Sequence, residues 1–474
     1  MEQPLFQKTI AELAPLIKSK EISPVDITKS VLNQAKDYNA QINAFISIDE
    51  EKALKAAKQA EAEISQGIYK GTLHGIPLAL KDILHFENER VTFGSKIHQS
   101  FISSEDATVV SKLKKAGITF TGKLNLHEYA YGPTNNNPHY GPCRNPWNIE
   151  KIPGGSSGGS AAVVAADLTI ASLGTDTAGS VRIPASACGI VGLKPTHGRV
   201  SKYGCFLLSW SLDHIGPMTK TVEDTAVLLE YIAGYDEKDP TTIDKPVENY
   251  ASSLTGDIKG KVIGIEEDYF FNTVDSNVKQ LVEAAILQLE SLGAKVELVK
   301  IPSLKYSEYT EYITFMAESA TIHRNNFMNQ LDQYGSDVQH LLKFSNIPSA
   351  VDYLQGQQVR TMMIKEFATV FSQVDVLISP TLPALPPTIG DEMVTIDGKE
   401  YPALASLIRL TSPGNLVGIP AVSIPCGFSD GLPVGLQIMG AAFQEKEVLN
   451  FAYAFEKSNP QFTRKPNLKE LLTN

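Results

Sequence analysis

Two loops built almost entirely from small residues constrain this chain more than any other part of its sequence. The first reads Gly-Gly-Ser-Ser-Gly-Gly-Ser at 154–160, and the second reads Gly-Thr-Asp-Thr-Ala-Gly-Ser at 174–180. Glycine is used where backbone takes a positive φ or passes close to a ligand, and such loops bury little apolar surface. Because stability alone does not favour them, we expect the loops to form two halves of one active site.

The chain has 474 residues and the composition of a soluble globular protein. No apolar run approaches the ~20 residues that a membrane-spanning helix needs. The opening Met-Glu-Gln-Pro-Leu lacks the basic and apolar regions of a secretory signal, so we expect a cytoplasmic protein. A formal net charge of -11 gives no general attraction to nucleic acid.

Cysteine and histidine spacing predicts no disulfide framework, metal or cofactor. The cysteines are Cys143, Cys188, Cys205 and Cys426, without a Cys-x-x-Cys pair. Small apolar neighbours favour an inert core thiol at Cys188 over the nucleophile of a thiol hydrolase. His127-Glu128 is not followed by the second histidine of a His-Glu-x-x-His zinc motif.

Local patterns predict helices first and then an alternation of strands and helices. Thr9 to Glu12 fits a capping box, Ser23-Pro24 fits a second helix start, and 50–66 is rich in helix formers. From Gly71 onward, short apolar runs alternate with glycine turns and helical stretches. The runs are 76–80, 168–173 and 262–265, and a helical stretch covers 278–292. The alternation predicts an α/β fold with a helical N-terminal flank.

The loop at 154–160 has two functional interpretations that its surroundings disfavour. A Walker phosphate loop ends in Gly-Lys-Ser/Thr, whereas Ser160 follows glycine and precedes two alanines. Residues 155–159 formally match the Gly-x-Ser-x-Gly nucleophile elbow of α/β-hydrolases. That elbow must follow a strand, and 144–153 contains two prolines and predicts an irregular loop.

A third interpretation joins both loops to a lysine. Lys81 ends the apolar run 76–80, so a buried strand would deliver it to the site. A poorly solvated lysine has a lowered pKa, and its neutral amine can then act as a base. Taken singly, Lys81 and the loop serines are ordinary surface and turn residues, so the joint pattern carries the interpretation.

Together these residues resemble the amidase signature family. The resemblance is strong over 71–224 and returns at 415–427 and 431–440. It implies one large α/β domain over 1–474, with a central mixed, twisted sheet and helices on both faces. Its expected parts are a helical flank at 1–66, the signature core with the triad at 71–224 and a variable substrate-pocket region at 250–400.

The resemblance also implies a Ser-Ser-Lys triad that forms a covalent acyl-enzyme. Ser180 would be the nucleophile, and Ser156, with a cis peptide bond, would pass its proton to neutral Lys81. The implied oxyanion hole consists of the backbone N–H groups of Thr177, Ala178, Gly179 and Ser180. Ala178 stands where the family usually has glycine. The implied structural support comes from Ser157, Asp176 and Arg182.

The family resemblance leaves two catalytic roles open. One is a stand-alone amidase, and the other is the glutaminase component of a tRNA-dependent amidotransferase, its A subunit, which releases ammonia for partner subunits. Arg360, in Gln-Gln-Val-Arg, resembles the arginine that holds the glutamine α-carboxylate. The aspartate that would hold the α-ammonium falls at Ile408, which cannot pair with an ammonium. We therefore favour the stand-alone amidase.

The expected substrate is a small-molecule amide, bound by residues of the signature core and of the variable region after Asn249. The candidate pocket residues are Tyr131, Thr134, Asn136 and Arg360. We expect no membrane partner, and the sequence allows either a monomer or a homodimer. A non-catalytic scaffold held by partners is a further alternative, which the intact Lys81, Ser156 and Ser180 disfavour.

Overall fold

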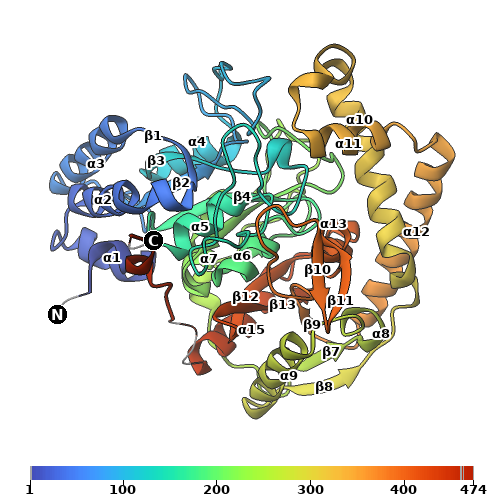
Figure 1. Ribbon diagram of the computed structural model, residues 1–474. Helices are drawn as coiled ribbons and strands as arrows, with labels where there is room; N and C mark the ends of the chain where they lie inside the picture. The colour runs from blue at the N-terminus through green and yellow to red at the C-terminus, as the bar shows by residue number, and fades with distance from the viewer. Residues whose placement is uncertain (1–2, 460–461, 463, 473–474) are drawn as a thin grey trace.

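One large mixed sheet organises the chain in the computed structural model, which describes residues 3–459, 462 and 464–472 (Figure 1). In the described ranges, eleven strands follow the order β1-β3-β2-β4-β6-β5-β12-β13-β9-β7-β8. Their bounds are β1 (Phe45–Ile48), β2 (Pro77–Lys81), β3 (Thr119–Leu124), β4 (Ala171–Asp176), β5 (Val191–Lys194), β6 (His214–Thr219), β7 (Val262–Ile265), β8 (Lys295–Leu298), β9 (Val376–Pro380), β12 (Ala421–Ser429) and β13 (Leu432–Gly440). A separate hairpin joins β10 (Met393–Ile396) to β11 (Lys399–Pro402).

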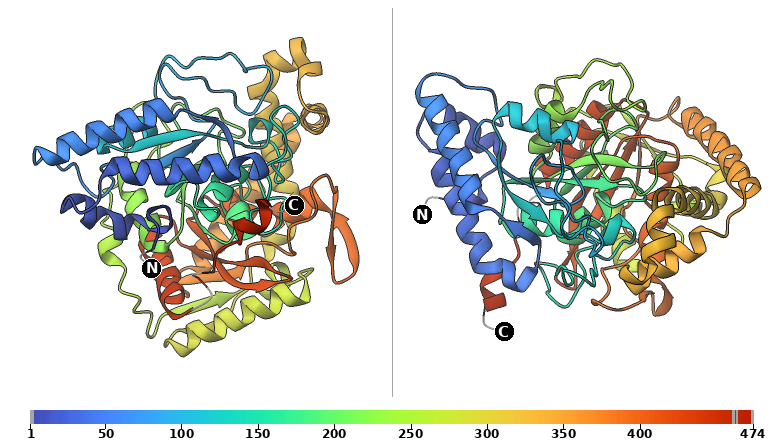
Figure 2. Two further views of the ribbon diagram at one scale, coloured as in Figure 1. Left: turned by 60° about the vertical axis from the view of Figure 1, so that its left-hand side comes forward. Right: turned by 90° about the horizontal axis from the view of Figure 1, so that it is seen from above.

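Helices pack on the sheet and extend beyond both of its ends. Their bounds are α1 (Ile10–Lys18), α2 (Pro24–Ile42), α3 (Glu50–Ser65), α4 (Thr108–Ala116), α5 (Gly158–Ala165), α6 (Arg182–Cys188), α7 (Val222–Ile232), α8 (Glu267–Phe270), α9 (Ser276–Ser291), α10 (Ser307–Gln330), α11 (Ser336–Ser345), α12 (Ala350–Val370), α13 (Ala403–Arg409), α14 (Ser412–Leu416) and α15 (Glu445–Ser458). Helices α6, α9 and α15 all contact β12 and β13, and every residue of β13 is buried, so both faces of the sheet are covered at this strand (Figure 2). Figure 1 places α1–α3 at one end of the molecule and α10–α12 at the other.

The sheet mixes parallel and antiparallel pairs, as the family resemblance implies. Strand β2 is parallel to both β3 and β4, and β7 is parallel to both β8 and β9. Strands β4 and β6, and β12 and β13, pair antiparallel. The strands β2, β4, β6, β9 and β13 are buried at every position, which explains the apolar runs of β2, β9 and β13.

The predicted helix starts are confirmed. The Thr9 hydroxyl accepts the Glu12 N–H at 3.1 Å, and the Glu12 carboxylate accepts the Thr9 N–H at 2.8 Å. Ser23 caps α2, with Pro24 at the first helical position. No helix among the residues described here has the length and apolar character that crossing a membrane requires.

The strand expected in the apolar run 168–173 begins three residues later than that run. Leu168 donates its N–H to the Val163 carbonyl, and Asp167 has a φ of 57°, so the start of the run closes the end of α5. Strand β4 therefore begins at Ala171 and ends at Asp176, three residues into the second glycine-rich loop. This shift places β4 beside β2 with both carboxyl ends at one edge of the sheet, which brings Lys81 close to the loops.

Candidate active site

Lys81 lies at the end of β2, fully buried among three hydroxyl groups. Its Nζ is 2.7 Å from Ser156 Oγ, 2.9 Å from Ser157 Oγ and 2.8 Å from Thr175 Oγ1. Burial lowers the pKa of the Lys81 ammonium from 10.5 to about 7. The amine is therefore substantially neutral at neutral pH, as expected for a base.

The first glycine-rich loop is tied to β4 and to the second loop. Ser157 Oγ accepts the Thr175 N–H at 3.2 Å and donates to the Thr175 carbonyl at 3.1 Å. The Ser157 N–H donates to the Ser180 carbonyl at 3.3 Å, which links the two loops directly. The Gly155–Ser156 peptide bond is cis. A Cβ on Gly155 would lie 2.8 Å from the Asn135 nitrogen, so this close approach requires glycine.

Asp176 and Arg182 hold the turn that carries Ser180. The Asp176 carboxylate accepts the N–H groups of Gly179 at 2.9 Å and Val181 at 3.1 Å. It also accepts Arg182 Nη2 at 2.9 Å and Nε at 3.0 Å. Burial opposes ionisation of Asp176, but the Arg182 charge and hydrogen bonds lower its pKa to about 2. This buried pair is therefore fully charged and orients the turn.

Residues from the C-terminal part of the chain complete the support of this pair. Asn415 donates from Nδ2 to Asp176 Oδ1 at 2.8 Å and accepts Arg182 Nη2 at 2.6 Å. Gln437 Oε1 accepts Arg182 Nη1 at 2.6 Å. The returning segments of the family resemblance, 415–427 and 431–440, thus supply partners that the sequence analysis did not single out.

The turn at 177–180 leaves three of its four expected oxyanion donors unengaged. The Gly179 N–H donates to Asp176, whereas the N–H groups of Thr177, Ala178 and Ser180 have no hydrogen-bond partner in the described chain. Gly179 has a φ of +121°, and a Cβ there would lie 2.2 Å from Thr411 Oγ1. Ala178 takes no positive φ, so alanine in place of glycine is accommodated.

Thr411 and Asp213 each form a hydrogen bond with a residue of this turn. Thr411 Oγ1 donates to the Ala178 carbonyl at 2.5 Å, and Thr177 Oγ1 donates to Asp213 at 2.6 Å. Burial raises the pKa of Asp213 to about 6. Among the three residues of the expected triad, Ser180 keeps 8% of its surface exposed, whereas Lys81 and Ser156 have 0%. Ser180 is therefore the most accessible of the three residues.

The four candidate pocket residues differ in their surroundings. Tyr131 is buried, and its hydroxyl is 2.6 Å from Ser345 Oγ. Thr134 is half-buried, with its hydroxyl 3.3 Å from His127 Nδ1, and Asn136 is exposed.

Arg360, the fourth, is half-buried and already makes three hydrogen bonds. It donates to the Leu416 carbonyl at 2.6 Å, to Ser211 Oγ at 2.8 Å and to the Ser211 carbonyl at 2.9 Å. The guanidinium therefore links α12 to α14 and to the loop before β6. Ile408 is buried on α13, and its carbonyl accepts the Thr411 N–H.

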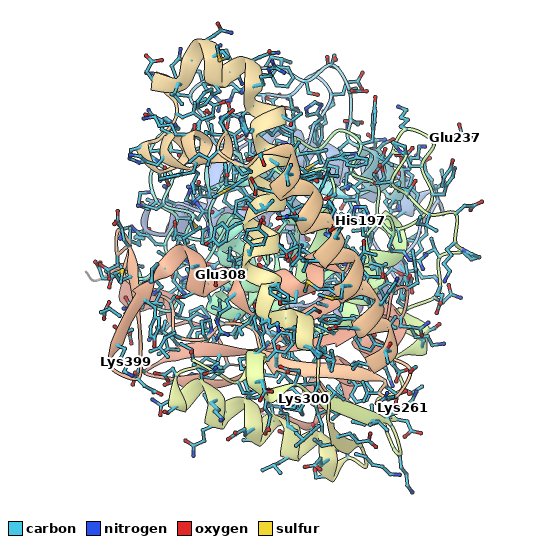
Figure 3. All side chains as sticks on the ribbon, turned by 90° about the vertical axis from the view of Figure 1, so that its right-hand side faces the viewer. His197, Glu237, Lys261, Lys300, Glu308 and Lys399 are labelled. Carbon is cyan, nitrogen blue, oxygen red and sulfur yellow. The ribbon has the colours of Figure 1, made fainter. Side chains whose placement is uncertain are left out.

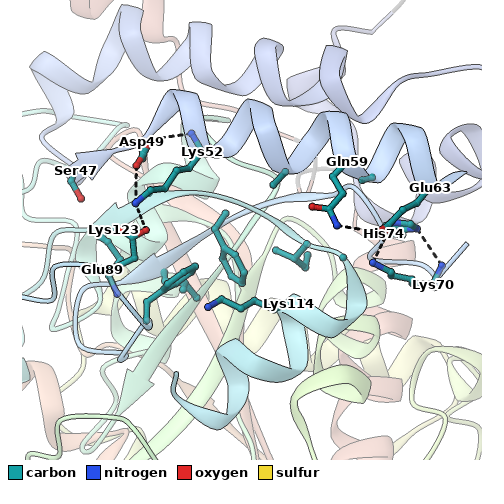
Figure 4. Close-up of a pocket in the computed structure, with 18 residues that line it drawn as sticks. Ser47, Asp49, Lys52, Gln59, Glu63, Lys70, His74, Glu89, Lys114 and Lys123 are labelled. Carbon is teal, nitrogen blue, oxygen red and sulfur yellow. Dashed lines mark hydrogen bonds and ion pairs between the residues drawn. The ribbon is translucent and has the colours of Figure 1, made fainter. Parts of the chain in front are cut away.

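A cavity of about 310 Å³ lies under α3, and neither Lys81, Ser156 nor Ser180 lines it (Figure 4). Leu80, Phe86 and Phe120 give it an apolar floor, and paired charges surround it. Lys70 pairs with Glu63 at 2.6 Å, as one example. In the described ranges, no group of three or more His, Cys, Asp or Glu side chains could hold a metal ion.

Comparisons of the sequence and of the fold with known proteins all match proteins related to amidases. The family model described as Amidase matches residues 26–449. The curated A subunit of glutamyl-tRNA(Gln) amidotransferase from Geobacillus kaustophilus is 40% identical over 490 residues, covering 98% of this chain and 100% of that protein. One similar solved structure comes from work on a vestigial protein complex and the origins of an s-triazine catabolic enzyme. Its TM-score is 0.91 at 31% identity, and the match covers 95% of this chain and 98% of that chain. A crystal structure of an amidase has a TM-score of 0.88 at 31% identity, and the match covers 95% of this chain and 100% of that chain.

Proposed function

The chain belongs to the amidase family, and on this premise we propose that it hydrolyses a small carboxylic amide through Ser180, Ser156 and Lys81. The observation that carries the proposal is the contact of the buried Lys81 amine with three hydroxyls at 2.7–2.9 Å. A lysine with a pKa of about 7 supplies a base without histidine.

The proton path follows from the donors available to a neutral amine, which has two N–H groups and one lone pair. Ser157 directs its own proton to the Thr175 carbonyl, so it accepts from Lys81. The lone pair of Nζ is then free to accept from Ser156. As Ser180 attacks the amide carbonyl, its proton moves to Ser156 Oγ while the Ser156 proton moves to Lys81.

The second half of the reaction returns these protons. Collapse of the tetrahedral intermediate breaks the carbon–nitrogen bond, and the proton on Lys81 passes back through Ser156 to the leaving nitrogen. Water then attacks the acyl ester of Ser180 by the same path, giving the carboxylic acid and free serine. We assign the oxyanion to the N–H groups of Thr177, Ala178 and Ser180, because the Gly179 N–H already serves Asp176.

A second candidate function is that of the glutaminase component in a tRNA-dependent amidotransferase. The 40% identity to curated A subunits over their whole length supports it, and these relatives favour it over the stand-alone amidase. The geometry supports the stand-alone amidase: Ile408 offers no charge to an α-ammonium, and Arg360 makes three hydrogen bonds within the chain. Both candidates use the same triad, so they differ in substrate and partners.

Ammonia release by the purified chain distinguishes the two candidates. The panel is glutamine, benzamide, a fatty amide and a peptide amide, each with Ser180→Ala as the control. Turnover of a simple amide that the variant lacks supports a self-sufficient amidase. Activity on glutamine alone, or only after partner proteins are added, supports the amidotransferase component. Full activity in Ser180→Ala contradicts the triad in either setting.

A further inference from the structure

Glu311 on α10 is fully buried, and neither oxygen of its carboxyl group has a hydrogen-bond partner. Among the described residues, no other buried acid leaves both oxygens without a partner; Asp82, Glu445 and Glu456 each leave one. An unpartnered buried carboxyl group destabilises a fold, because it has lost its hydration without replacement. Glu311 therefore suits a role that folding alone does not explain.

The position of Glu311 connects it to Tyr131, one of the candidate pocket residues. Glu311, Phe315 and Ser319 recur every four residues and so share one face of α10. The Phe315 ring packs edge-on against the Tyr131 ring, with 5.8 Å between the ring centroids, and Ser319 Oγ lies 3.3 Å from the Tyr131 hydroxyl oxygen. The segment that carries Tyr131 begins at His127, whose N–H donates to the Ser156 carbonyl.

The charges that act on Glu311 include the Asp176–Arg182 pair, which holds the turn of Ser180. They come from Arg360, Asp176, Arg182 and Glu318. Burial raises the pKa of the Glu311 carboxyl well above its usual range, while the Arg360 charge opposes this rise. Arg360 makes no ion pair with Glu311, because its three hydrogen bonds go to Leu416 and Ser211. The carboxyl thus keeps its capacity to receive a donor.

We propose that Glu311 determines substrate specificity by receiving an ammonium or other N–H donor group of the amide substrate. This inference rests on the proposed function, since it takes Ser180 as the reacting centre. It also gives the pocket an acid that the apolar Ile408 does not provide. The α-ammonium of glutamine and the terminal ammonium of an amino-alkyl amide share this chemistry, so both serve as probes.

Binding in a Ser180→Ala background tests the inference without relying on turnover. Calorimetry compares δ-aminovaleramide with hexanamide, in which a methyl group replaces the ammonium, and glutamine with glutaramic acid, which lacks the ammonium. We expect Glu311→Gln to weaken binding of the preferred ammonium-bearing probe about 10- to 100-fold, the usual effect of losing a hydrogen bond to a charged group. Hexanamide binding should change less than about threefold.

Two further variants separate recognition from folding. Glu308→Gln changes an exposed acid on the same helix, one turn before Glu311, and should leave all four affinities unchanged (Figure 3). Glu311→Met removes the buried polar group, so it should raise the melting temperature while abolishing the preference for the ammonium. Equal affinity of the parent for charged and uncharged probes, or an unchanged preference in Glu311→Gln and Glu311→Met, overturns the inference.

A reactive uncharged ester tests the proposed function separately in the chain with Ser180 intact. Acylation by this ester needs Ser180 but no ammonium, so Glu311→Gln should retain it. Acylation without selection of ammonium probes overturns the role of Glu311 and leaves the hydrolase standing. Selective binding by Ser180→Ala, together with no acylation of the parent, supports Glu311 and contradicts the hydrolase.

Discussion

The pH dependence of serine acylation offers the sharpest test of the role given to Lys81. Burial lowers the pKa of Lys81 from 10.5 to about 7, and the neutral amine is the form that accepts a proton. The neutral fraction is about a tenth at pH 6, about half at pH 7 and about nine tenths at pH 8. The acylation rate should therefore rise about tenfold from pH 6 to pH 8 and then level.

The assay is the second-order rate of Ser180 acylation by an uncharged reactive ester, measured from pH 5 to pH 10. An uncharged ester has no titration of its own, so the profile reports the enzyme. Asp213, whose burial raises its pKa to about 6, also titrates in this range and hydrogen-bonds Thr177. Asp213→Asn removes that titration. Because the Asp213 charge raises the pKa of Lys81, the rise should persist in this variant with its midpoint moved to lower pH. Lys81→Met should abolish acylation at every pH.

Two profiles would refute this reasoning. A rate that keeps rising tenfold per pH unit above pH 8 would mean that Lys81 has an ordinary pKa, and a flat profile would mean that no lysine proton is involved. Stability gives an independent check. Between pH 7 and 10.5 the unfolded chain binds more protons than the folded chain at Lys81, so stability should rise with pH across this window. The full difference between pKa values of 10.5 and about 7 corresponds to about 5 kcal/mol.

Three further predictions concern the support of the triad. Asp176→Asn leaves Arg182 buried without its partner, so urea unfolding should show a loss of about 3–5 kcal/mol, and an unchanged midpoint contradicts the assigned pairing. In the parent chain the pKa of Asp176 is lowered from 3.8 to about 2; the resulting stabilisation is present above pH 3.8 and should be lost as pH falls through 2, as acid titration of the fold would measure. Gly179→Ala places a Cβ 2.2 Å from Thr411 Oγ1 and should abolish acylation. Its control is Gly356→Ala inside α12, where the new Cβ meets no atom closer than 3.5 Å, so this variant should keep activity and gain about 0.5–1 kcal/mol of stability. Equal activity of the two variants contradicts the close packing at Gly179.

Local chemistry could be predicted from the sequence wherever neighbouring residues decide it. The capping box at Thr9, the cap at Ser23 and the strand that ends at Lys81 all depend on patterns within a few residues. The apolar run 168–173 predicts a strand that begins three residues too early, because the run does not reveal that its first residues close α5. Periodicity identifies a buried segment, but the neighbouring helix end decides where pairing begins.

The wider site could not be predicted, because its supports converge from distant parts of the chain. Arg182 meets Asn415 and Gln437 across more than 200 residues, and Thr411 reaches Ala178 over a similar separation. Glu311 carried no signal in the sequence, since a glutamate on a helix is usually exposed. Its lack of a partner becomes visible only when the surrounding side chains are placed.

Burial has opposite outcomes at Lys81 and Asp176, and the partners of each side chain explain the difference. Hydroxyl groups surround Lys81 and carry no charge, so burial lowers its pKa to about 7 and favours the neutral amine. Asp176 is equally buried, but the guanidinium of Arg182 and two backbone N–H groups keep it charged, with a pKa of about 2. One side chain is thereby prepared to accept a proton at neutral pH, and the other stays a fixed charge that holds the turn. The same contrast applies to Glu311, which has neither hydroxyl nor N–H partners, so burial favours its neutral form until substrate brings a cation that stabilises the carboxylate.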